Sequence, residues 1–259
     1  MKKTTRKKRE RRNTIAGVGI VIIALIGISF LIITISPKQQ INQEEQPVNE
    51  SELELPIATE TPTNENKIKN EPQMLASITP YYEQNNDTVG YIRIDNTVID
   101  YPVLFSGDNE FYMTRDFTKQ DKEGGAIFMD FRVDYSDIHN NRNVILYGHR
   151  MRDGTMFKDL TEYEKKDFFY NNSRITFDTL YEHHEWEVFA AFQTHIDFYY
   201  IQTHFENDQE WLNFLYKCQD LSKFETDTKF YATDTILTLS TCTGSNRNKR
   251  WVVMARLIE

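Results

Sequence analysis

The chain has 259 residues and a formal net charge of −9 at neutral pH, a length that suits one large domain with appendages or two small domains. The charge is unevenly distributed, because residues 1–12 carry eight Lys or Arg and one Glu, a local charge of +7, which leaves −16 for the rest. Phosphate backbones are bound by clustered cations, so this acidic body argues against a nucleic-acid partner.

An uncharged stretch, Asn13 to Pro37, directly follows the basic block of residues 1–12. Within it, Thr14–Ile35 supplies the ~20 apolar residues that a bilayer-spanning helix needs. A cleavable signal peptide has a shorter apolar core and a small-residue cleavage site, so we expect an uncleaved signal anchor over residues 13–36. Positive residues stay on the cytoplasmic side, which predicts a single-pass protein of the cell membrane with its N-terminus inside and its body outside.

Residues 37–72 are rich in Gln, Asn, Glu, Thr and Pro and contain no aromatic residue. Such a segment cannot bury enough apolar surface to offset the entropy of ordering, so it is predicted to be a flexible extracellular tether. All three Trp residues lie beyond it. Residues 73–259 are long enough for one sizeable core and are expected to form a single catalytic domain.

This body consists of short runs rich in β-branched and aromatic residues, separated by Asn, Asp and Gly, which is typical of strands. The predicted strands cover residues 89–94, 97–105, 125–130, 143–149, 174–180, 184–195, 229–242 and 250–258. Helical spacing occurs at residues 154–172 and 207–224, and a short helix interrupted by Pro80 is expected over Gln73–Glu83. Many strands with few helices predict an antiparallel barrel or sandwich with peripheral helices.

The two cysteines have different contexts. Cys218 lies at a helical apolar position and is expected to be a packed helix residue, although an extracellular location also permits a disulfide between Cys218 and Cys242. Cys242 ends the alternating run TILTLSTC, in which Leu237 and Leu239 face a core while Cys242 shares the polar face with Ser240. A cysteine at the polar end of a strand is a candidate nucleophile.

Two further residues are candidates for chemistry with that cysteine. His149 terminates an apolar strand just after Gly148, which places an imidazole at a strand exit. Arg250 opens the last strand, and if that strand pairs beside the strand of Cys242, its guanidinium lies near the thiol and suits a developing oxyanion. Taken alone, His149 could equally be a structural histidine and Arg250 a surface arginine. The chain has no HExxH or CxxC spacing, so a zinc site is not supported.

The run TLSTC followed by RWVVMARLI, with ILYGHRMRDGTMFKDL upstream, resembles the sortases, in particular class B. The similarity extends over residues 87–258. It implies an eight-stranded sortase-type β-barrel, with an N-terminal helix at Gln73–Glu83 and a helix at Asp208–Phe224 before the cysteine-bearing strand. A papain-like protease fits poorly, because its cysteine precedes its histidine.

The resemblance implies a catalytic set made of Cys242, His149 and Arg250, without metal or cofactor. It also implies a set of residues that bind the substrate. These are Asn109, Met113, Tyr147, Tyr200, Ile201 and Ser240. The connection from Cys242 to Arg250 is about two residues shorter than in well-known class B members, and Thr243 stands where an acidic residue is often found. We expect this departure to affect which sorting signal is preferred.

The function implied by the resemblance is that of a membrane-anchored cysteine transpeptidase. It would cleave an NPxTx-like sorting signal after Thr through a thioacyl intermediate on Cys242. The exported protein that carries this C-terminal signal would then be joined to the amine of a lipid-linked peptidoglycan precursor. Two alternatives remain from the sequence: a sortase that polymerises pilins, and an anchored extracellular binding module without catalysis.

Overall fold

The computed structural model describes residues 72–242 and 248–258. The predicted basic segment 1–12, the predicted anchor 13–36 and all but the last residue of the predicted tether 37–72 lie outside the described residues. Within the described part of the chain, no helix combines the length and hydropathy that crossing a bilayer requires.

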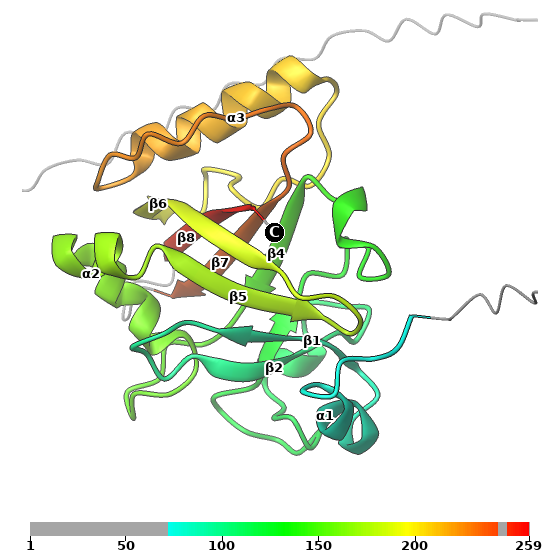
Figure 1. Cartoon of the computed structure of the whole chain (residues 1–259). Helices are drawn as coiled ribbons and strands as arrows, with labels where there is room; N and C mark the ends of the chain where they lie inside the picture. The colour runs from blue at the N-terminus through cyan, green and yellow to red at the C-terminus, as the bar shows by residue number, and fades with distance from the viewer. Residues whose placement is uncertain (1–71, 243–247, 259) are drawn as a thin grey trace, which may run out of the picture. The chain divides into compact units, whose positions relative to one another are not determined.

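Eight strands close into one barrel in the order β1-β2-β3-β4-β7-β8-β6-β5 (Figure 1). Their bounds are β1 Thr88–Arg93, β2 Asp100–Leu104, β3 Ile127–Met129, β4 Asn143–Tyr147, β5 Arg174–Thr179, β6 Glu185–His195, β7 Ile236–Cys242 and β8 Lys249–Leu257. The expected eight-stranded barrel is confirmed. The expectation of a fully antiparallel sheet is wrong, because β2 pairs with β3, and β4 with β7, in parallel. β2 and β3 follow each other in the chain, whereas β5 and β6 lie between β4 and β7.

The alternating pattern of β7 separates two apolar layers. Leu237 and Leu239 point into the barrel and pack in its interior cluster with Val144 and Leu146 of β4. Ile236, on the other face of β7, belongs to a second cluster outside the barrel. The strand is therefore covered on both faces and bonded along both edges, to β4 and to β8.

Helix α3 (Asp208–Leu221) supplies the outer layer over β6 and β8 (Figure 1). Asn207 precedes the helix as its N-cap, and its side chain accepts a hydrogen bond from the Glu210 N–H. Its apolar stripe, which includes Trp211, Leu215 and Cys218, is buried against the barrel. Cys218 is a free thiol in this layer, which rules out the Cys218–Cys242 disulfide, and burial raises the pKa of the thiol far above its ordinary value.

The other helical segments differ in detail from expectation. Helix α1 spans only Thr79–Gln84, and Pro80 opens its first turn rather than interrupting it, because a first-turn residue needs no intrahelical N–H bond. The pattern at 154–172 becomes the 3₁₀ helix η3 (Phe157–Glu164) and the short α2 (Lys166–Asn171). Two further 3₁₀ turns are η1 (Phe111–Met113) and η2 (Ile138–Asn140).

The run predicted as a strand over 229–242 joins the sheet only from Ile236. Before it, Asp234 accepts a hydrogen bond from the Tyr231 N–H and closes a turn, so this part of the chain does not reach the β7 ladder. The difference is physical, because the turn hydrogen bond competes with pairing at that point.

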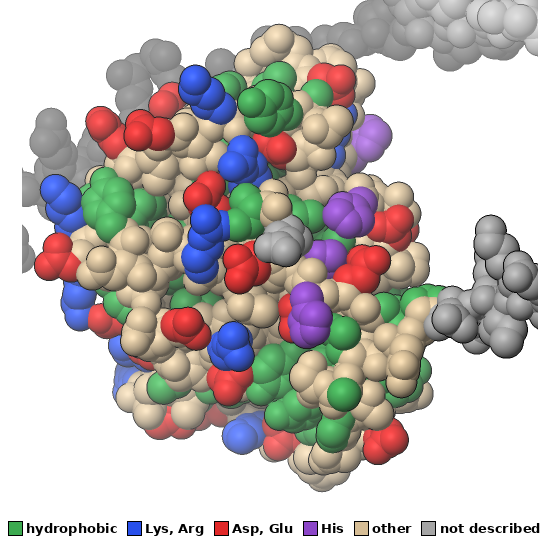
Figure 2. Space-filling view, viewed as in Figure 1, with side chains coloured by type: hydrophobic (Ala, Val, Ile, Leu, Met, Phe, Trp, Pro, Cys, Tyr) green, Lys and Arg blue, Asp and Glu red, His purple; other side chains and the backbone are tan. Residues whose placement is uncertain are grey.

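Acidic and basic side chains are intermixed on the face of the body seen in Figure 2. The described residues also form exposed ion pairs, such as Arg93 with Asp95 and Lys223 with Glu164. Exposed pairs of this kind contribute little to stability. The two apolar clusters inside and outside the barrel are therefore the main source of the free energy of folding.

Candidate active site

The ends of β7 and β8 bring two of the candidate residues together. The strands are antiparallel, and their register pairs Cys242 with Arg250. The pairing that the sequence left conditional is therefore confirmed for the backbone. Arg250 is half-buried and donates from Nη1 to the Lys249 carbonyl at 3.1 Å.

The polar face of β7 is not exposed, contrary to what its alternation suggested. The Thr238 hydroxyl donates to Asn143 Oδ1 at 2.7 Å, and the Ser240 hydroxyl lies 2.8 Å from that of Tyr200. Both Thr238 and Ser240 are buried. The Thr238 and Ser240 hydroxyls each have a specific hydrogen-bond partner, as buried hydroxyls require.

Gly148 carries β4 directly to the site. Its N–H donates to the Ser240 carbonyl at 3.3 Å, which continues the β4–β7 ladder one residue beyond Tyr147. A Cβ at this position would lie 2.4 Å from Ile127 Cδ1 and 2.7 Å from the Phe157 ring. Glycine is thus the residue that lets the strand exit pass between these two side chains and places His149 beside the end of β7.

His149 is oriented by a backbone carbonyl. Its Nε2 lies 2.8 Å from the Met113 carbonyl oxygen. A carbonyl oxygen only accepts, so Nε2 carries the hydrogen and Nδ1 is the nitrogen left for proton exchange. Gly125, where φ is +55°, lies close to the Met113 carbonyl, and a Cβ at this position would lie 2.6 Å from that oxygen.

A cavity of about 290 Å³ lies where these strand ends meet. The predicted residues that line it are Asn109, Met113, Tyr147, His149, Ser240 and Arg250. Phe128, Gly148 and Thr241 also line it and were not predicted. Six candidates from four separate stretches of the chain therefore line one cavity.

Tyr200 and Ile201 are placed differently from the other predicted substrate residues. Tyr200 is buried, and its hydroxyl reaches Ser240 from behind the cavity wall. Ile201 packs against the cluster under α3. Neither is among the residues that line the 290 Å³ cavity.

A family profile described as the sortase domain matches residues 92–258. The chain belongs to the sortase family. This sortase is 38% identical to sortase B of Staphylococcus aureus (strain NCTC 8325 / PS 47) over 207 residues, which cover 76% of this chain and 84% of the relative.

Solved structures agree with this assignment. A Bacillus anthracis protein similar to sortase B is 40% identical, with a TM-score of 0.67, covering 73% of this chain and 85% of the other. A Staphylococcus aureus sortase B–substrate complex is 37% identical, with a TM-score of 0.67, covering 72% and 87%. The sortase is therefore of class B, and sortases are cysteine transpeptidases.

A buried carboxylate lies directly behind the cavity of this sortase. The Asp130 side chain is fully buried and accepts hydrogen bonds from Asn109 Nδ2 at 3.0 Å, the Tyr147 hydroxyl at 2.8 Å, and Arg132 Nη2 at 2.7 Å. Burial alone raises the pKa of Asp130, but the hydrogen bonds from Arg132 and Tyr147 outweigh it and hold the pKa below its usual value. Burial, followed by the charge of Asp130, raises the pKa of Tyr147.

Sequence reasoning missed Asp130, since an aspartate at the end of a strand usually reads as a solvated residue. Its signal, if any, is its position after the fully buried strand IFM, where a turn residue would be expected to face water. Phe128 was missed for a similar reason: an aromatic residue in a strand predicts core, and Phe128 is indeed almost fully buried while still touching the cavity.

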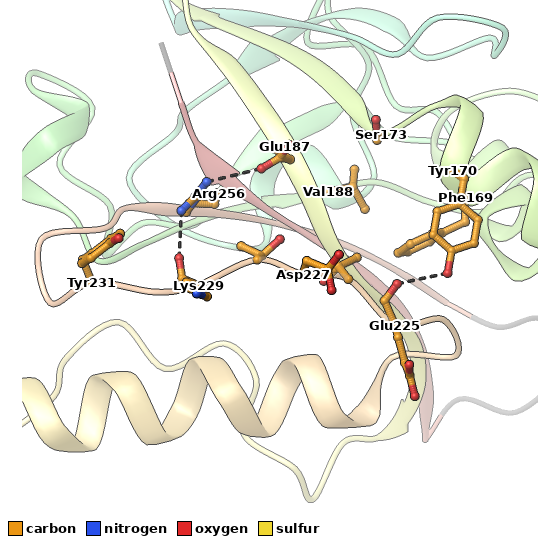
Figure 3. Close-up of a pocket in the computed structure, with 12 residues that line it drawn as sticks. Phe169, Tyr170, Ser173, Glu187, Val188, Glu225, Asp227, Lys229, Tyr231 and Arg256 are labelled. Carbon is orange, nitrogen blue, oxygen red and sulfur yellow. Dashed lines mark hydrogen bonds and ion pairs between the residues drawn. The ribbon is translucent and has the colours of Figure 1, made fainter.

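A larger cavity, of about 730 Å³, lies elsewhere in the described part of the chain. It is bordered by β6, α2 and the chain after α3, with the ion pair of Arg256 and Glu187 on its wall (Figure 3). Arg256 and Arg250 are six residues apart on β8, about 20 Å along an extended strand. None of the predicted site residues lines this cavity, so its size does not make it the catalytic centre.

The shorter connection from Cys242 to Arg250, with Thr243 in place of an acidic residue, was predicted to affect which sorting signal is preferred. Residues 243–247, which include Thr243, lie outside the described residues. The register of Cys242 with Arg250 is set by the strands on either side of that loop.

Proposed function

We propose that this sortase cleaves an exported protein after the threonine of an NPxTx-like signal and joins it to a peptidoglycan amine. Cys242 is the nucleophile, His149 the proton donor and acceptor, and Arg250 the group that stabilises the oxyanion. The protein acts outside the cell while residues 13–36 hold it in the membrane.

The observation that carries this proposal is the register of β7 and β8 together with the shared cavity. Cys242 and Arg250 are cross-strand partners, and residues paired in this way in antiparallel sheets have Cβ atoms about 5 Å apart. His149 and Arg250 line the same 290 Å³ cavity. These two observations support a site in which Cys242, His149 and Arg250 act together at the adjoining ends of β4, β7 and β8, although the three residues lie far apart in sequence.

The chemistry follows from these positions. The Cys242 thiol gives its proton to Nδ1 of His149 and its sulfur attacks the threonine carbonyl, and the negative charge that develops on the carbonyl oxygen is held by the Arg250 guanidinium. One such donor typically contributes about 3 kcal/mol to the transition state. As the amide C–N bond breaks, His149 gives a proton to the departing amine, leaving a thioacyl enzyme. His149 then takes a proton from the incoming amine, whose nitrogen attacks the thioester and releases Cys242.

The sorting peptide is recognised by the cavity wall. Asn109 supplies an amide for hydrogen bonding and Met113, which is 44% exposed, supplies an apolar contact. Tyr147 and Ser240 complete the wall, and Tyr200 supports Ser240 through the bond between their hydroxyls. Ile201 acts through the position of the β6–α3 loop.

The anchor has a kinetic purpose in this proposal. Both the sortase and its substrate are held in one membrane during export, so they meet by diffusion in two dimensions. Tethering of this kind raises the effective concentration without any new contact. A lipid-linked peptidoglycan precursor is presented at the same surface, which makes its amine the natural acceptor.

The test is cleavage of a peptide panel by the full-length protein in detergent, with and without an amine acceptor. NPxTx peptides are expected to be cleaved after Thr and transferred to the amine, and LPxTG peptides are expected to react at least tenfold more slowly. Cleavage at another bond, or no cleavage of any panel member, contradicts the proposed signal.

Single substitutions separate the three roles. Cys242→Ala is expected to abolish both cleavage and the thioacyl adduct. His149→Ala and Arg250→Ala are expected to lower kcat/KM by at least about a hundredfold, while circular dichroism stays as in wild type. A substitution that leaves kcat/KM intact removes that residue from its proposed role. If Cys242 reacts with a thiol reagent no faster than a free thiol and no peptide is cleaved, the binding-module alternative stands.

A further inference from the structure

The hydrogen bonds of Asp130 tie together three separate parts of the groove. Asn109 belongs to the segment before η1, and Tyr147 ends β4; both line the cavity and both donate to the same oxygen, Oδ2. Asn109 is fixed a second time, because its Oδ1 accepts from the Phe131 N–H at 3.1 Å. The side-chain rotamers of two wall residues therefore depend on one carboxylate that does not itself touch the cavity.

Arg132 extends this network to the β6–α3 loop. Two of its nitrogens grip Asp130, with Nε at 2.8 Å from Oδ1 and Nη2 at 2.7 Å from Oδ2, while Nη1 donates to the Tyr199 hydroxyl at 2.6 Å. The next residue of that loop, Tyr200, bonds Ser240. Two adjacent tyrosines thus hold the loop beside the cavity. Tyr199 accepts a hydrogen bond from Arg132, and Tyr200 is hydrogen-bonded to Ser240 of β7.

We propose that Asp130 and Arg132 are positioning residues for the substrate groove: Asp130 sets the orientation of Asn109 and Tyr147, and Arg132 fastens the β6–α3 loop. They act through other residues and do not contact the peptide. The inference rests on the proposed function, since it takes the 290 Å³ cavity to be the place where the sorting peptide binds.

The alternative is that this ion pair serves stability alone. Burying a carboxylate is costly, and well-packed apolar residues often stabilise such a position equally well or better. The fully buried Asp130 carboxylate is paired with Arg132. It also accepts hydrogen bonds from two residues of the cavity wall, Asn109 and Tyr147. That distribution of partners favours a role in the geometry of the wall.

The test compares Asp130→Asn with a matched control, Asp178→Asn, in the full-length protein. Asp178 is also a buried carboxylate, and it accepts from His183 Nδ1 at 3.0 Å and from the His184 N–H at 3.1 Å. Its bonds fix the turn before β6, and it does not line the cavity. Both variants weaken a buried carboxylate acceptor, which in Asp130 pairs with Arg132 and in Asp178 bonds His183, so a rise in KM confined to Asp130→Asn separates positioning from stability.

Asp130→Asn is expected to raise KM for the sorting peptide about tenfold with kcat within threefold of wild type, because the acceptor for two wall residues is weakened. Asp178→Asn is expected to leave KM within twofold. An unchanged KM in Asp130→Asn, or an equal rise in Asp178→Asn, overturns the proposal. Tyr199→Phe removes only the hydroxyl at the exposed end of the network and tests the loop separately, with an expected two- to threefold rise in KM; no rise removes Arg132 from its role.

A double-mutant cycle tests whether Asp130 acts through the wall. In an Asn109→Ala background, Asp130→Asn is expected to raise KM by less than threefold, since one of the residues it positions is gone. A rise that is as large as in wild type contradicts positioning through Asn109.

Direct binding distinguishes this inference from the proposed chemistry. Calorimetric titration of the NPxTx peptide into Cys242→Ala protein, with and without Asp130→Asn, needs no catalysis. About tenfold weaker binding supports the positioning role even if the catalytic assignments fail. Equal binding by the two proteins overturns the positioning role while leaving the peptidase results untouched.

Discussion

Gly125→Ala perturbs the orientation of His149 from a distance. Gly125 has φ +55°, and a Cβ there would lie 2.4 Å from the Tyr112 carbonyl oxygen and 2.6 Å from that of Met113. The Met113 oxygen is the partner of His149 Nε2. A methyl group at residue 125 must therefore move the carbonyl that orients the imidazole.

Two costs add up in this variant. A left-handed conformation costs an alanine about 1–2 kcal/mol, and a clash with fixed backbone atoms costs about 1–3 kcal/mol more. The sum, about 2–5 kcal/mol, lowers Tm by about 2–4 °C for each kcal/mol in a domain of this size. A shift of about 1 Å in a catalytic group can cost up to about a hundredfold in rate, so we expect kcat to fall by ten- to a hundredfold.

Gly154→Ala is the matched control. Gly154 also has a positive φ, +92°, but a Cβ there meets nothing within 4 Å. It should lose stability through backbone strain alone and keep its kcat. Thermal melts by circular dichroism and peptide-cleavage kinetics below both melting temperatures give the comparison. If Gly125→Ala keeps a wild-type kcat while it melts lower than Gly154→Ala, the Met113 carbonyl does not control His149.

The remaining predictions concern pH, thiol reactivity and helix capping. The pKa of Asp130 is depressed in the folded protein, so its stabilisation is present above the unfolded pKa of about 3.9 and is lost as pH falls through the folded pKa; in urea titrations the difference in unfolding free energy between wild type and Asp130→Asn should shrink as pH falls below about 4. Cys218 is fully buried with a raised pKa, so Cys242→Ala protein should be labelled by a thiol reagent only after denaturation, and rapid native labelling would contradict the burial. Asn207→Ala removes the α3 cap and should cost about 1 kcal/mol with kcat/KM unchanged; an unaltered Tm would show that the cap is replaced by another group.

Much of the barrel was predictable because its strands alternate strictly. In β7 the side chains of Leu237 and Leu239 had to share one face, and the position of Cys242 opposite Arg250 followed once β7 and β8 were adjacent. Local rules also mark the exit of β4 at Gly148. What alternation cannot give is the neighbour of each strand, so the parallel pairing of β4 with β7 was not anticipated.

The hydrogen bonds of Asp130 behind the cavity also could not be predicted from the strand pattern. Asn109 and Tyr147 meet at Asp130 from positions 21 and 17 residues away in the chain. No periodicity connects such residues, since their contact depends on how a loop and two strands pack. The buried state of Ser240 was missed for the same reason: its partner Tyr200 lies 40 residues away.

The register of β7 with β8 holds the backbone of Cys242 opposite that of Arg250 across two hydrogen-bonded strands. Insertions or deletions between them alter the length of a connection, whereas the facing pair stays anchored by the ladders of β7 and β8. We therefore expect changes in the length of that connection to leave the backbone pairing of Cys242 with Arg250 in place.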